Sequence, residues 1–433
     1  MKTIYARDLD RFVGKEITFQ GWVHSVRSLG KLCFVVLRDK TGTVQATFKQ
    51  GVFEGDIKEV ENVPNESVIE VCGTVQPKPK GGYEILAKNY KVISKSDPIP
   101  IEIWNPDVKT KLSNRIKYRF LDLRKPEVYS IFSVRQKVFN AFREILNEKN
   151  FVEMHTPKIV SIGAESGSEV FEVSYFGKTA YLSQSPQLYK QMLMASGVDR
   201  YYEIATYWRA EKSHTKRHIT EFWMLDVEIA WIKDHYELVD FVKDLLTQVI
   251  DKTCKTCKEE FEVLQVEPEI PKRIPTITLD EAKNILKREF NKELPQNEDL
   301  DTEGERLLGT YFLDEYNEPI VIVLHYPWEK RPFYHMRLEE EPAYTKSFDV
   351  IYKGIEIATG SQREHRYDIL VKQAREKGIN PERLKYYLEA FKYGIPPHGG
   401  FGLGLDRFVK QLLNLEDIRE CVLWPRDPEH ILP

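Results

Sequence analysis

Residues 207–229, Y-W-R-A-E-K-S-H-T-K-R-H-I-T-E-F-W-M-L-D-V-E-I, decide how the larger part of this 433-residue chain folds. The stretch begins as an apolar strand that ends at Arg209 and Glu211, crosses a polar loop, and resumes as an alternating strand from Glu221. A period of two gives the second strand one mixed face, made of Phe222, Met224, Asp226 and Glu228. Ionised groups rarely stay buried without partners, so this face is either a binding surface or part of a solvated hairpin with surface salt bridges.

A second segment, G-G-F-G-L-G-L-D-R-F at residues 399–408, favours the binding surface. Alternating glycines allow a backbone to approach a ligand closely. The residues that follow have helical spacing, which places Arg407 at the junction between a glycine-rich strand and a helix. A glycine run alone is weak evidence for a binding site, because many strands and turns carry glycine for packing. Its combination with an R-x-E hairpin favours a ligand-binding surface more strongly.

At these residues the chain resembles the class II aminoacyl-tRNA synthetases, and within them the archaeal-type aspartyl enzymes. R-A-E at residues 209–211 is similar to their motif 2, and G-L-G-L-D-R at residues 402–407 is similar to motif 3. The resemblance extends over essentially the whole chain. It implies an α+β protein with an N-terminal OB-fold β-barrel and a class II catalytic domain, in which helices flank an antiparallel sheet. It also implies ATP-dependent activation of L-aspartate and its transfer to tRNA(Asp).

The chain order suggests three parts: an OB-fold anticodon-binding domain at residues 1–105, a hinge at 106–126 and the catalytic domain at 127–433. Five short strands separated by turns between residues 16 and 95 favour a small barrel. Three prolines between residues 97 and 107 interrupt regular structure. A long amphipathic helix is expected from Glu127, followed by a strand broken at Pro157. This pair is similar to motif 1, which implies a homodimer.

Composition is that of an ordinary soluble protein, with 42% hydrophobic and 30% charged residues. No apolar run approaches ~20 residues, and the first residues lack the apolar core of a signal peptide, so we expect a cytoplasmic protein without a membrane span. With a net charge of -4 the chain has no overall positive field, so any nucleic-acid-binding surface is a local basic patch. Cys254 and Cys257 form a C-x-x-C without a second pair, which is a weak zinc signal.

The implied chemistry explains why arginines dominate the motifs. In amino-acid activation a carboxylate attacks the α-phosphorus of ATP, and a carboxylate is already ionised near neutral pH. No general base is needed, so the protein has to position the reactants and neutralise phosphate charge. We therefore expect arginines together with Mg²⁺.

The resemblance assigns these roles to particular residues. Arg209 and Arg407 are the expected catalytic residues: Arg209 clamps the α-phosphate and the amino-acid carboxylate, and Arg407 sandwiches the adenine against Phe222. The full set expected to bind ATP is Arg209, Ala210, Glu211, Arg217, His218, Ile219, Phe222, Glu356, Gly404, Leu405, Asp406 and Arg407. A K-G turn at residues 353–354 would bring together the expected metal ligands Asp349, Glu356 and Thr359, where the family usually has Ser in place of the threonine.

The expected amino-acid site contains Glu165, Gln187, Lys190, Arg209, Asp226, Thr359 and Arg363. Lys190 and Arg363 would neutralise the side-chain carboxylate of aspartate, while Asp226 and Glu165 would hold its ammonium group. Asparaginyl-tRNA synthetases share the hairpin sequence but typically carry an apolar residue at the position of Lys190. Because an unpaired buried charge is costly, Lys190 favours aspartate over asparagine.

The expected anticodon surface contains His24, Phe34, Gln45 and Lys80. Phe34 is either a stacking platform for a base or a core residue of the barrel. His24 resembles relaxed enzymes that also charge tRNA(Asn), whereas Lys80 matches discriminating relatives, so the tRNA range stays open. Alternative functions are an asparaginyl-tRNA synthetase, a noncatalytic tRNA-binding paralogue and an amidating asparagine synthetase, of which the last is disfavoured by the barrel.

Overall fold

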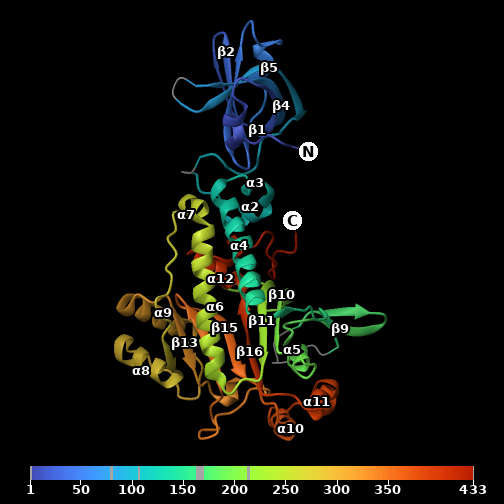
Figure 1. Ribbon diagram of the computed structural model, residues 1–433, viewed down its shortest axis with the longest axis vertical. Helices are drawn as coiled ribbons and strands as arrows, with labels where there is room; N and C mark the ends of the chain where they lie inside the picture. The colour runs from blue at the N-terminus through green and yellow to red at the C-terminus, as the bar shows by residue number, and fades with distance from the viewer. Residues whose placement is uncertain (1, 79–80, 106–107, 162–169, 212–214, 433) are drawn as a thin grey trace. The chain divides into compact units, whose positions relative to one another are not determined.

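The computed structural model describes residues 2–78, 81–105, 108–161, 170–211 and 215–432 (Figure 1). The chain divides into two compact units, Met1–Pro126 and Glu127–Pro433. Within the described ranges, none of the helices is long and apolar enough to cross a membrane.

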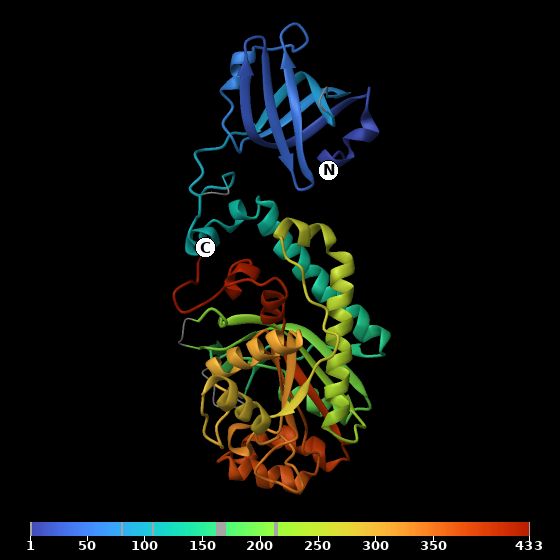
Figure 2. The ribbon, with the colours of Figure 1, turned by 90° about the vertical axis from the view of Figure 1, so that its left-hand side faces the viewer.

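The first unit contains a closed five-stranded barrel, visible in blue in Figure 2. Its strands follow the order β1-β2-β3-β5-β4, and only β3 and β5 pair in parallel. The short helices η1 and α1 lie at Ala6–Phe12 and Ile57–Glu61. Alternate residues of each strand fill the interior, among them Phe19, Phe48 and Val71. All five predicted strands are confirmed, with the bounds β1 Glu16–Leu29, β2 Leu32–Asp39, β3 Gly42–Lys49, β4 Val68–Pro77 and β5 Tyr83–Ser94.

The segment that follows the barrel is more regular than its sequence indicates. The sequence predicts only a linker, whereas the structure has two short helices, α2 (Leu112–Lys117) and α3 (Arg119–Asp122). Buried charge holds this segment together: Arg119 pairs with Asp122 at 3.0 Å, and Arg124 binds Glu66 of the barrel. Helices this short show no apolar periodicity, so a pattern search misses them.

The second unit is built on an eight-stranded sheet of order β12-β13-β14-β15-β16-β11-β10-β6. Its six central strands are antiparallel, as predicted, but each edge strand pairs in parallel with its neighbour, so the sheet is mixed. The bounds are β6 Val152–Glu153, β10 Arg200–Trp208, β11 Glu221–Ala230, β12 Thr276–Thr278, β13 Ile320–Leu324, β14 Ser347–Tyr352, β15 Ile355–Gln362 and β16 His398–Gly404.

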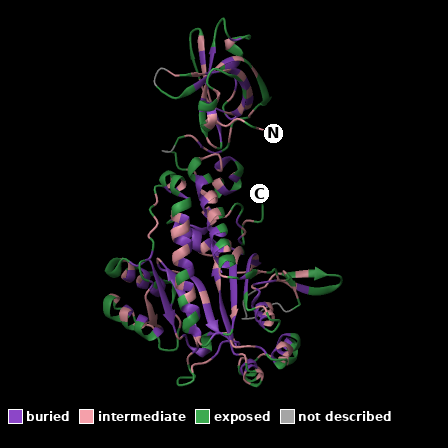
Figure 3. Cartoon of the chain, in the orientation of Figure 1, coloured by how far each residue is buried: buried purple, intermediate pink, exposed green. Residues whose placement is uncertain are grey.

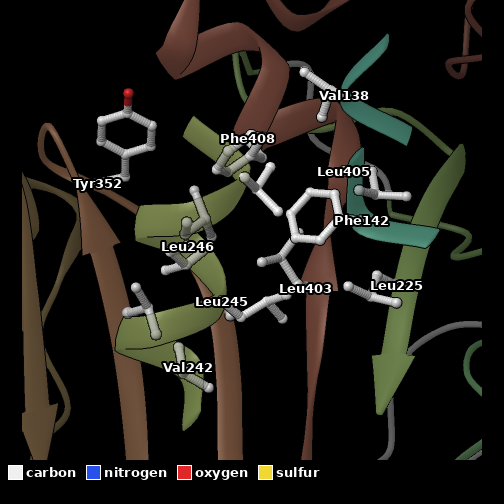
Figure 4. Packing of buried hydrophobic residues seen from close by; sticks show 14 of the residues in the cluster. Val138, Phe142, Leu225, Val242, Leu245, Leu246, Tyr352, Leu403, Leu405 and Phe408 are labelled. Carbon is white, nitrogen blue, oxygen red and sulfur yellow. The ribbon is translucent and has the colours of Figure 1, made fainter. Parts of the chain in front are cut away.

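Three helices cover one face of this sheet: α4 (Pro126–Glu148), α6 (His235–Thr256) and α12 (Leu405–Leu412). Figure 4 shows their apolar side chains meeting those of the strands, where Phe142 and Phe408 pack beside Leu225 and Leu403. The strands at the centre of the unit are almost entirely buried (Figure 3). The long helix predicted from Glu127 is confirmed.

Smaller elements complete the second unit. Helix α8 begins with a capping box, in which the Thr278 hydroxyl accepts from the backbone N–H of Glu281 and the Glu281 carboxylate accepts from the backbone N–H of Thr278. A separate three-stranded sheet is formed by β7 Ile159–Val160, β8 Glu172–Tyr175 and β9 Lys178–Leu182. The remaining helices are α5 Gln187–Met194, α7 Lys258–Leu264, α8 Leu279–Phe290, α9 Thr302–Tyr316, η2 Trp328–Lys330, α10 Tyr367–Glu376, η3 Pro381–Leu384, α11 Lys385–Lys392 and η4 Ile418–Cys421.

Candidate active site

A cavity of about 350 Å³ lies on the face of the large sheet that the core helices leave uncovered. The alternation along β11 produces it: Leu225 and Val227 join the core, while Met224 and Asp226 line the cavity. Glycines of β16 line the neighbouring strip, and a Cβ at Gly402 would come within 2.8 Å of the Met224 methyl group, which would have to move. The mixed face predicted from the sequence is therefore a cavity wall and not a solvated surface.

Charged groups stand at the end of the β10–β11 hairpin. The two strands pair without interruption from Arg200 opposite Ile229 to Trp208 opposite Glu221, so Arg209 leaves β10 directly beside β11. The Arg209 guanidinium lies 5.4 Å from the centre of the Phe222 ring. From the loop, Arg217 donates to Glu305 Oε2 at 2.7 Å. Arginines and an aromatic ring thus line one side of the cavity.

Arg407 stands at the junction of β16 and α12, as predicted, because the helix follows Gly404 directly. Its Nη1 donates to the carbonyl oxygen of Glu356 at 2.9 Å, which connects α12 to β15. At Gly404 an added Cβ would have no neighbour closer than 3.7 Å, the side chain of Arg407. The glycine therefore leaves open space next to the guanidinium, where a flat ligand can approach both.

A buried network of two cations and two carboxylates lies at and behind the cavity wall formed by Asp226 and Arg363. Lys190 Nζ, on α5, lies 3.1 Å from Asp226 Oδ1 and 3.5 Å from Glu228 Oε2, and it also donates to the carbonyl oxygen of Phe401 at 3.1 Å. Arg363 binds Glu228 through Nε at 2.9 Å and Nη2 at 3.2 Å. All four side chains are 2% exposed or less. Such a network persists because each charge has a partner.

The pKa values of the two carboxylates in this network are shifted in opposite directions. Burial raises the pKa of Asp226 despite its contact with Lys190. Burial alone would also raise the pKa of Glu228, but Arg363 and Lys190 together hold it below its usual value. Asp226 Oδ2 and Gln187 Nε2, which belong to residues that line the cavity, have no hydrogen-bond partner among the described residues. These groups are able to bind a ligand with a cationic and a polar end.

A smaller hollow of about 60 Å³ adjoins the cavity and is lined mainly by carboxylates. Arg331 Nη2 donates to Asp349 Oδ2 at 2.6 Å and lies 3.8 Å from Asp299. The backbone N–H of Glu356 donates to Glu305 Oε2 at 3.3 Å. The turn predicted at residues 353–354 is confirmed, with positive φ at both residues, and it places β14 beside β15 with Asp349 opposite Thr359.

The pKa values of Asp349 and Glu356, two acidic groups of the hollow, are shifted in opposite directions. Burial raises the pKa of Asp349 to about 7 against the effect of Arg331. Burial would raise the pKa of Glu356 as well, but Arg407 and Arg331 lower it below its usual value. Burial and the neighbouring Arg407 lower the pKa of His218 to about 4, so this histidine is neutral at physiological pH.

The cavity brings most of the predicted site residues together. Those that line it are Gln187, Arg209, Glu211, Arg217, His218, Ile219, Phe222, Asp226, Glu356, Thr359, Arg363, Gly404, Asp406 and Arg407. Lys190 lies behind Asp226, and Asp349 lines the smaller hollow. Ala210 is not among the lining residues. Glu165 and Lys80 lie outside the residues that the structure describes.

Two residues of motif 3 have structural roles that the sequence did not indicate. Leu405 is fully buried in the core under α12, so the ATP contact predicted for it is not made by its side chain. The Asp406 carboxylate accepts from Arg135 Nη2 and from the backbone N–H of Trp223, both at 2.8 Å. Asp406 therefore fixes α4 and β11 relative to α12, although it also borders the cavity.

Sequence reasoning missed Asp299, Glu305 and Arg331, and it gave Glu228 no partner. Glu305 lies on α9 and Asp299 just before it, in a region whose sequence was uninformative, and Arg331 follows the short helix η2. The one available signal was the charge of these residues, which is common on protein surfaces. Their burial, at 9% exposure or less for Glu305 and Arg331, becomes visible only in the fold.

Of the predicted anticodon residues, Phe34 and Gln45 lie on the same face of the paired strands β2 and β3. Phe34 is half-buried and absent from the barrel core, which removes the interpretation that it is a core residue. Gln45 Nε2 donates to Glu84 Oε2 at 2.7 Å, and Thr47 donates to the same oxygen. His24 lies edge-on to Trp104, with ring centres 4.2 Å apart. Glu84 was not singled out from the sequence.

Comparison with known proteins identifies the family. Residues 111–428 match the model of the class II tRNA synthetases (D, K and N), and residues 17–93 match that of the OB-fold nucleic acid binding domain. These matches cover the second unit and the barrel respectively.

Individual relatives extend over the whole chain. An aspartate–tRNA(Asp) ligase of Thermococcus kodakarensis is 43% identical over 100% of both chains, and an aspartate–tRNA(Asp/Asn) ligase of Aeropyrum pernix is 42% identical over 98% of this chain and 97% of its own. Among solved structures, asparaginyl-tRNA synthetase from Pyrococcus horikoshii complexed with asparaginyl-adenylate superposes with a TM-score of 0.92 at 31% identity, over 100% of both chains. With its barrel, its mixed sheet and an arginine-lined cavity at the motif residues, the chain belongs to the class II aminoacyl-tRNA synthetases of the D, K and N group.

Proposed function

We propose that this protein is an aspartate–tRNA ligase that activates L-aspartate with ATP and transfers it to tRNA(Asp). In the first step an oxygen of the aspartate α-carboxylate bonds to the α-phosphorus of ATP, and the bond from that phosphorus to the bridging oxygen breaks, which releases pyrophosphate. In the second step the terminal ribose hydroxyl of the tRNA attacks the acyl carbon, and AMP leaves.

The observation that carries this proposal is the buried pair of cations at and behind the cavity wall formed by Asp226 and Arg363. A second carboxylate on the substrate requires positive charge near a dry site, and the cations assigned to it are Arg363, which lines the cavity, and Lys190, which lies behind Asp226. Asp226 Oδ2 is buried without a hydrogen-bond partner among the residues that the structure describes, so it can accept from the substrate ammonium group. Asparagine would leave the two cations facing a neutral amide, which is a poorer counterpart.

The ATP side of the site rests on the arginines around the cavity. Arg209 is positioned to hold the α-phosphate and the substrate carboxylate with its planar fork, which Lys cannot imitate. Phe222 and Arg407 both line the cavity and are assigned to the two faces of the adenine ring. Arg217 and His218 are assigned to the distal phosphates and Glu211 to the adenine amino group. Since the nucleophile is already ionised, these residues act by positioning and by charge.

The residues present also fit a magnesium ion that arrives with ATP. Asp349 Oδ1 is buried and has no hydrogen-bond partner among the described residues, and Glu356 lies across the same hollow. Two carboxylates with substrate phosphates are the usual protein environment of Mg²⁺, and Thr359 offers a hydroxyl next to Glu356. When bound, the ion would neutralise phosphate charge and orient the leaving group.

Recognition of tRNA is assigned to the barrel, where Phe34 and Gln45 share one face of strands β2 and β3 that is suited to unstacked bases. Whether tRNA(Asn) is a further acceptor depends on His24, which resembles relaxed enzymes, and on Lys80, which matches discriminating ones.

We also propose a cytoplasmic homodimer. The dimer is supported by exposed apolar side chains at the β6 edge of the sheet, where Val152 is 46% and Met154 is 36% exposed.

The rival assignment is an asparaginyl-tRNA synthetase, favoured by the close superposition on such an enzyme. Exchange of radioactive pyrophosphate into ATP without tRNA separates the candidates, because it requires only the first step. Exchange that depends on aspartate supports the proposal. Exchange that depends on asparagine overturns it in favour of the rival, and a folded protein without exchange for either amino acid is a noncatalytic tRNA-binding paralogue.

A further inference from the structure

The smaller hollow gathers acidic side chains around a single cation. Its lining includes four carboxylates, Asp299, Glu305, Asp349 and Glu356, and one cation, Arg331. Glu305 is additionally paired with Arg217, and Arg407 donates to the backbone carbonyl oxygen of Glu356. Asp299 and Asp349 therefore depend on Arg331 for their nearest positive charge.

The guanidinium of Arg331 is fixed from several sides. It lies 3.9 Å from the centre of the Tyr326 ring, donates to Asp349 Oδ2 at 2.6 Å and lies 3.8 Å from Asp299 Oδ2. The residue is only 9% exposed. Contact with an aromatic face, a carboxylate and low exposure together hold a positive charge at one defined place.

The network around this charge is nevertheless incomplete. Asp349 Oδ1 and Arg331 Nε are both buried and have no hydrogen-bond partner among the described residues, and Asp349 is only 5% exposed. A buried oxygen without a donor normally has an explanation. The hollow, at about 60 Å³, also has room for a small ion and water. Yet no three ligand side chains in the described part of the chain converge closely enough to hold a metal ion by themselves.

We propose that Arg331 is the resident counter-cation of the magnesium site, and that it keeps this site closed to divalent cations until ATP contributes its phosphates. Its charge stabilises Asp299 and Asp349 in the free enzyme and repels a second cation from the same hollow. The phosphates of ATP supply the negative charge that allows both cations to remain. Arg331 is thus a positioning residue, which acts through Asp349, and this inference rests on the ATP-dependent chemistry proposed above.

A purely structural ion pair would look the same at rest, so the test measures metal binding and not activity. Mn²⁺ is titrated into the full-length protein in the absence of ATP and amino acid, and the free ion is followed by electron paramagnetic resonance. The variant Arg331→Gln removes the charge. The matched control is Arg337→Gln, because Arg337 lies 4.0 Å from the Trp328 ring and pairs with Glu376 but does not line the hollow.

We expect wild type and Arg337→Gln to bind Mn²⁺ appreciably only when ATP is added. Arg331→Gln should bind Mn²⁺ without ATP at least about tenfold more tightly than wild type, because a full positive charge has left the site. The double variant Arg331→Gln/Asp299→Asn should lose much of this gain. Tight binding by ATP-free wild type overturns the proposal, and so does an Arg331→Gln variant that binds no better than wild type.

Folding does not limit the test, because Arg331→Lys keeps the charge but not the fork that reaches both Asp299 and Asp349. Arg331→Lys should therefore bind Mn²⁺ without ATP as weakly as wild type, and a gain in this variant overturns the proposal even if Arg331→Gln fails to fold. No amino acid is present in the titration, with or without ATP, so the outcome is independent of the amino acid that the enzyme activates. A protein that does not charge tRNA(Asp) would refute the proposed function alone.

Discussion

Replacing Lys190 with leucine removes one of the two buried cations at and behind the cavity wall formed by Asp226 and Arg363. Lys190 Nζ lies 3.1 Å from Asp226 Oδ1 and 3.5 Å from Glu228 Oε2, and all three side chains are almost inaccessible. Arg363 still faces Glu228 in the variant, but Asp226 loses its closest cation. Breaking a buried ion pair from one side typically costs about 3–5 kcal/mol of folding free energy.

The loss of aspartate recognition should have a similar origin. The side-chain carboxylate of the substrate would then enter a dry site with one cation instead of two. We expect the transition state for aspartate to lose about 2–4 kcal/mol of stabilisation, which lowers kcat/KM for aspartate roughly 30- to 1,000-fold. The ATP contacts come from other residues, so the KM for ATP should change little. Pyrophosphate exchange at varied aspartate and ATP concentrations measures both quantities.

Two further variants separate recognition from stability. Lys158 pairs with buried Glu203 and does not line the cavity, so Lys158→Leu should lower the thermal midpoint and leave the KM for aspartate nearly unchanged. Lys190→Leu/Asp226→Asn should recover part of the stability, because no buried carboxylate remains unpaired. A folded Lys190→Leu variant with unchanged aspartate kinetics would refute the assignment of Lys190 as the substrate's counter-cation.

Three other predictions concern separate parts of the molecule. Gly404→Ala should fold normally, because its Cβ meets nothing closer than 3.7 Å, but raise the KM for ATP; an unchanged KM would mean that this wall does not contact the nucleotide. Burial and His325 lower the pKa of His235 to about 4, below its value in the unfolded chain. As the pH falls from ~6.5 toward 4, the unfolded chain therefore takes up a proton first. The stability that neutral His235 provides at higher pH is lost in this window. His235→Gln should reduce the change in unfolding free energy across that pH window, measured by urea unfolding, by up to about 3 kcal/mol. Parallel curves for wild type and variant would contradict this. Phe34→Ala should weaken tRNA binding by about 1–3 kcal/mol without changing pyrophosphate exchange, and an equal effect on both would remove Phe34 from the anticodon surface.

The local parts of the fold were predictable because their signals lie within a few residues. The strand alternation at β11, the turn at residues 353–354 and the glycine junction before Arg407 each depend on neighbouring residues and were found in the structure as expected. The parallel edge strands β6 and β12 were not foreseen, because pairing of so few residues depends on where distant segments arrive. The mixed sheet is a property of the assembled unit.

The candidate site divides in the same way. Motif residues such as Arg209 and Phe222 line the cavity, as predicted from the chain alone. Arg331 and Asp299 are brought to the hollow by long-range packing, and no local pattern distinguishes a surface charge from a buried one. For Lys190 the sequence indicated the charge but not its position behind Asp226, which only the packing of α5 against the sheet determines.

The most direct test of the account is aminoacylation of purified tRNA(Asp) and tRNA(Asn), each with aspartate and with asparagine. We expect aspartyl-tRNA(Asp), and the presence or absence of aspartyl-tRNA(Asn) decides between the relaxed and the discriminating form. Formation of asparaginyl-tRNA(Asn) without any aspartyl-tRNA would contradict the account, because Lys190 and Arg363 would then not select the second carboxylate.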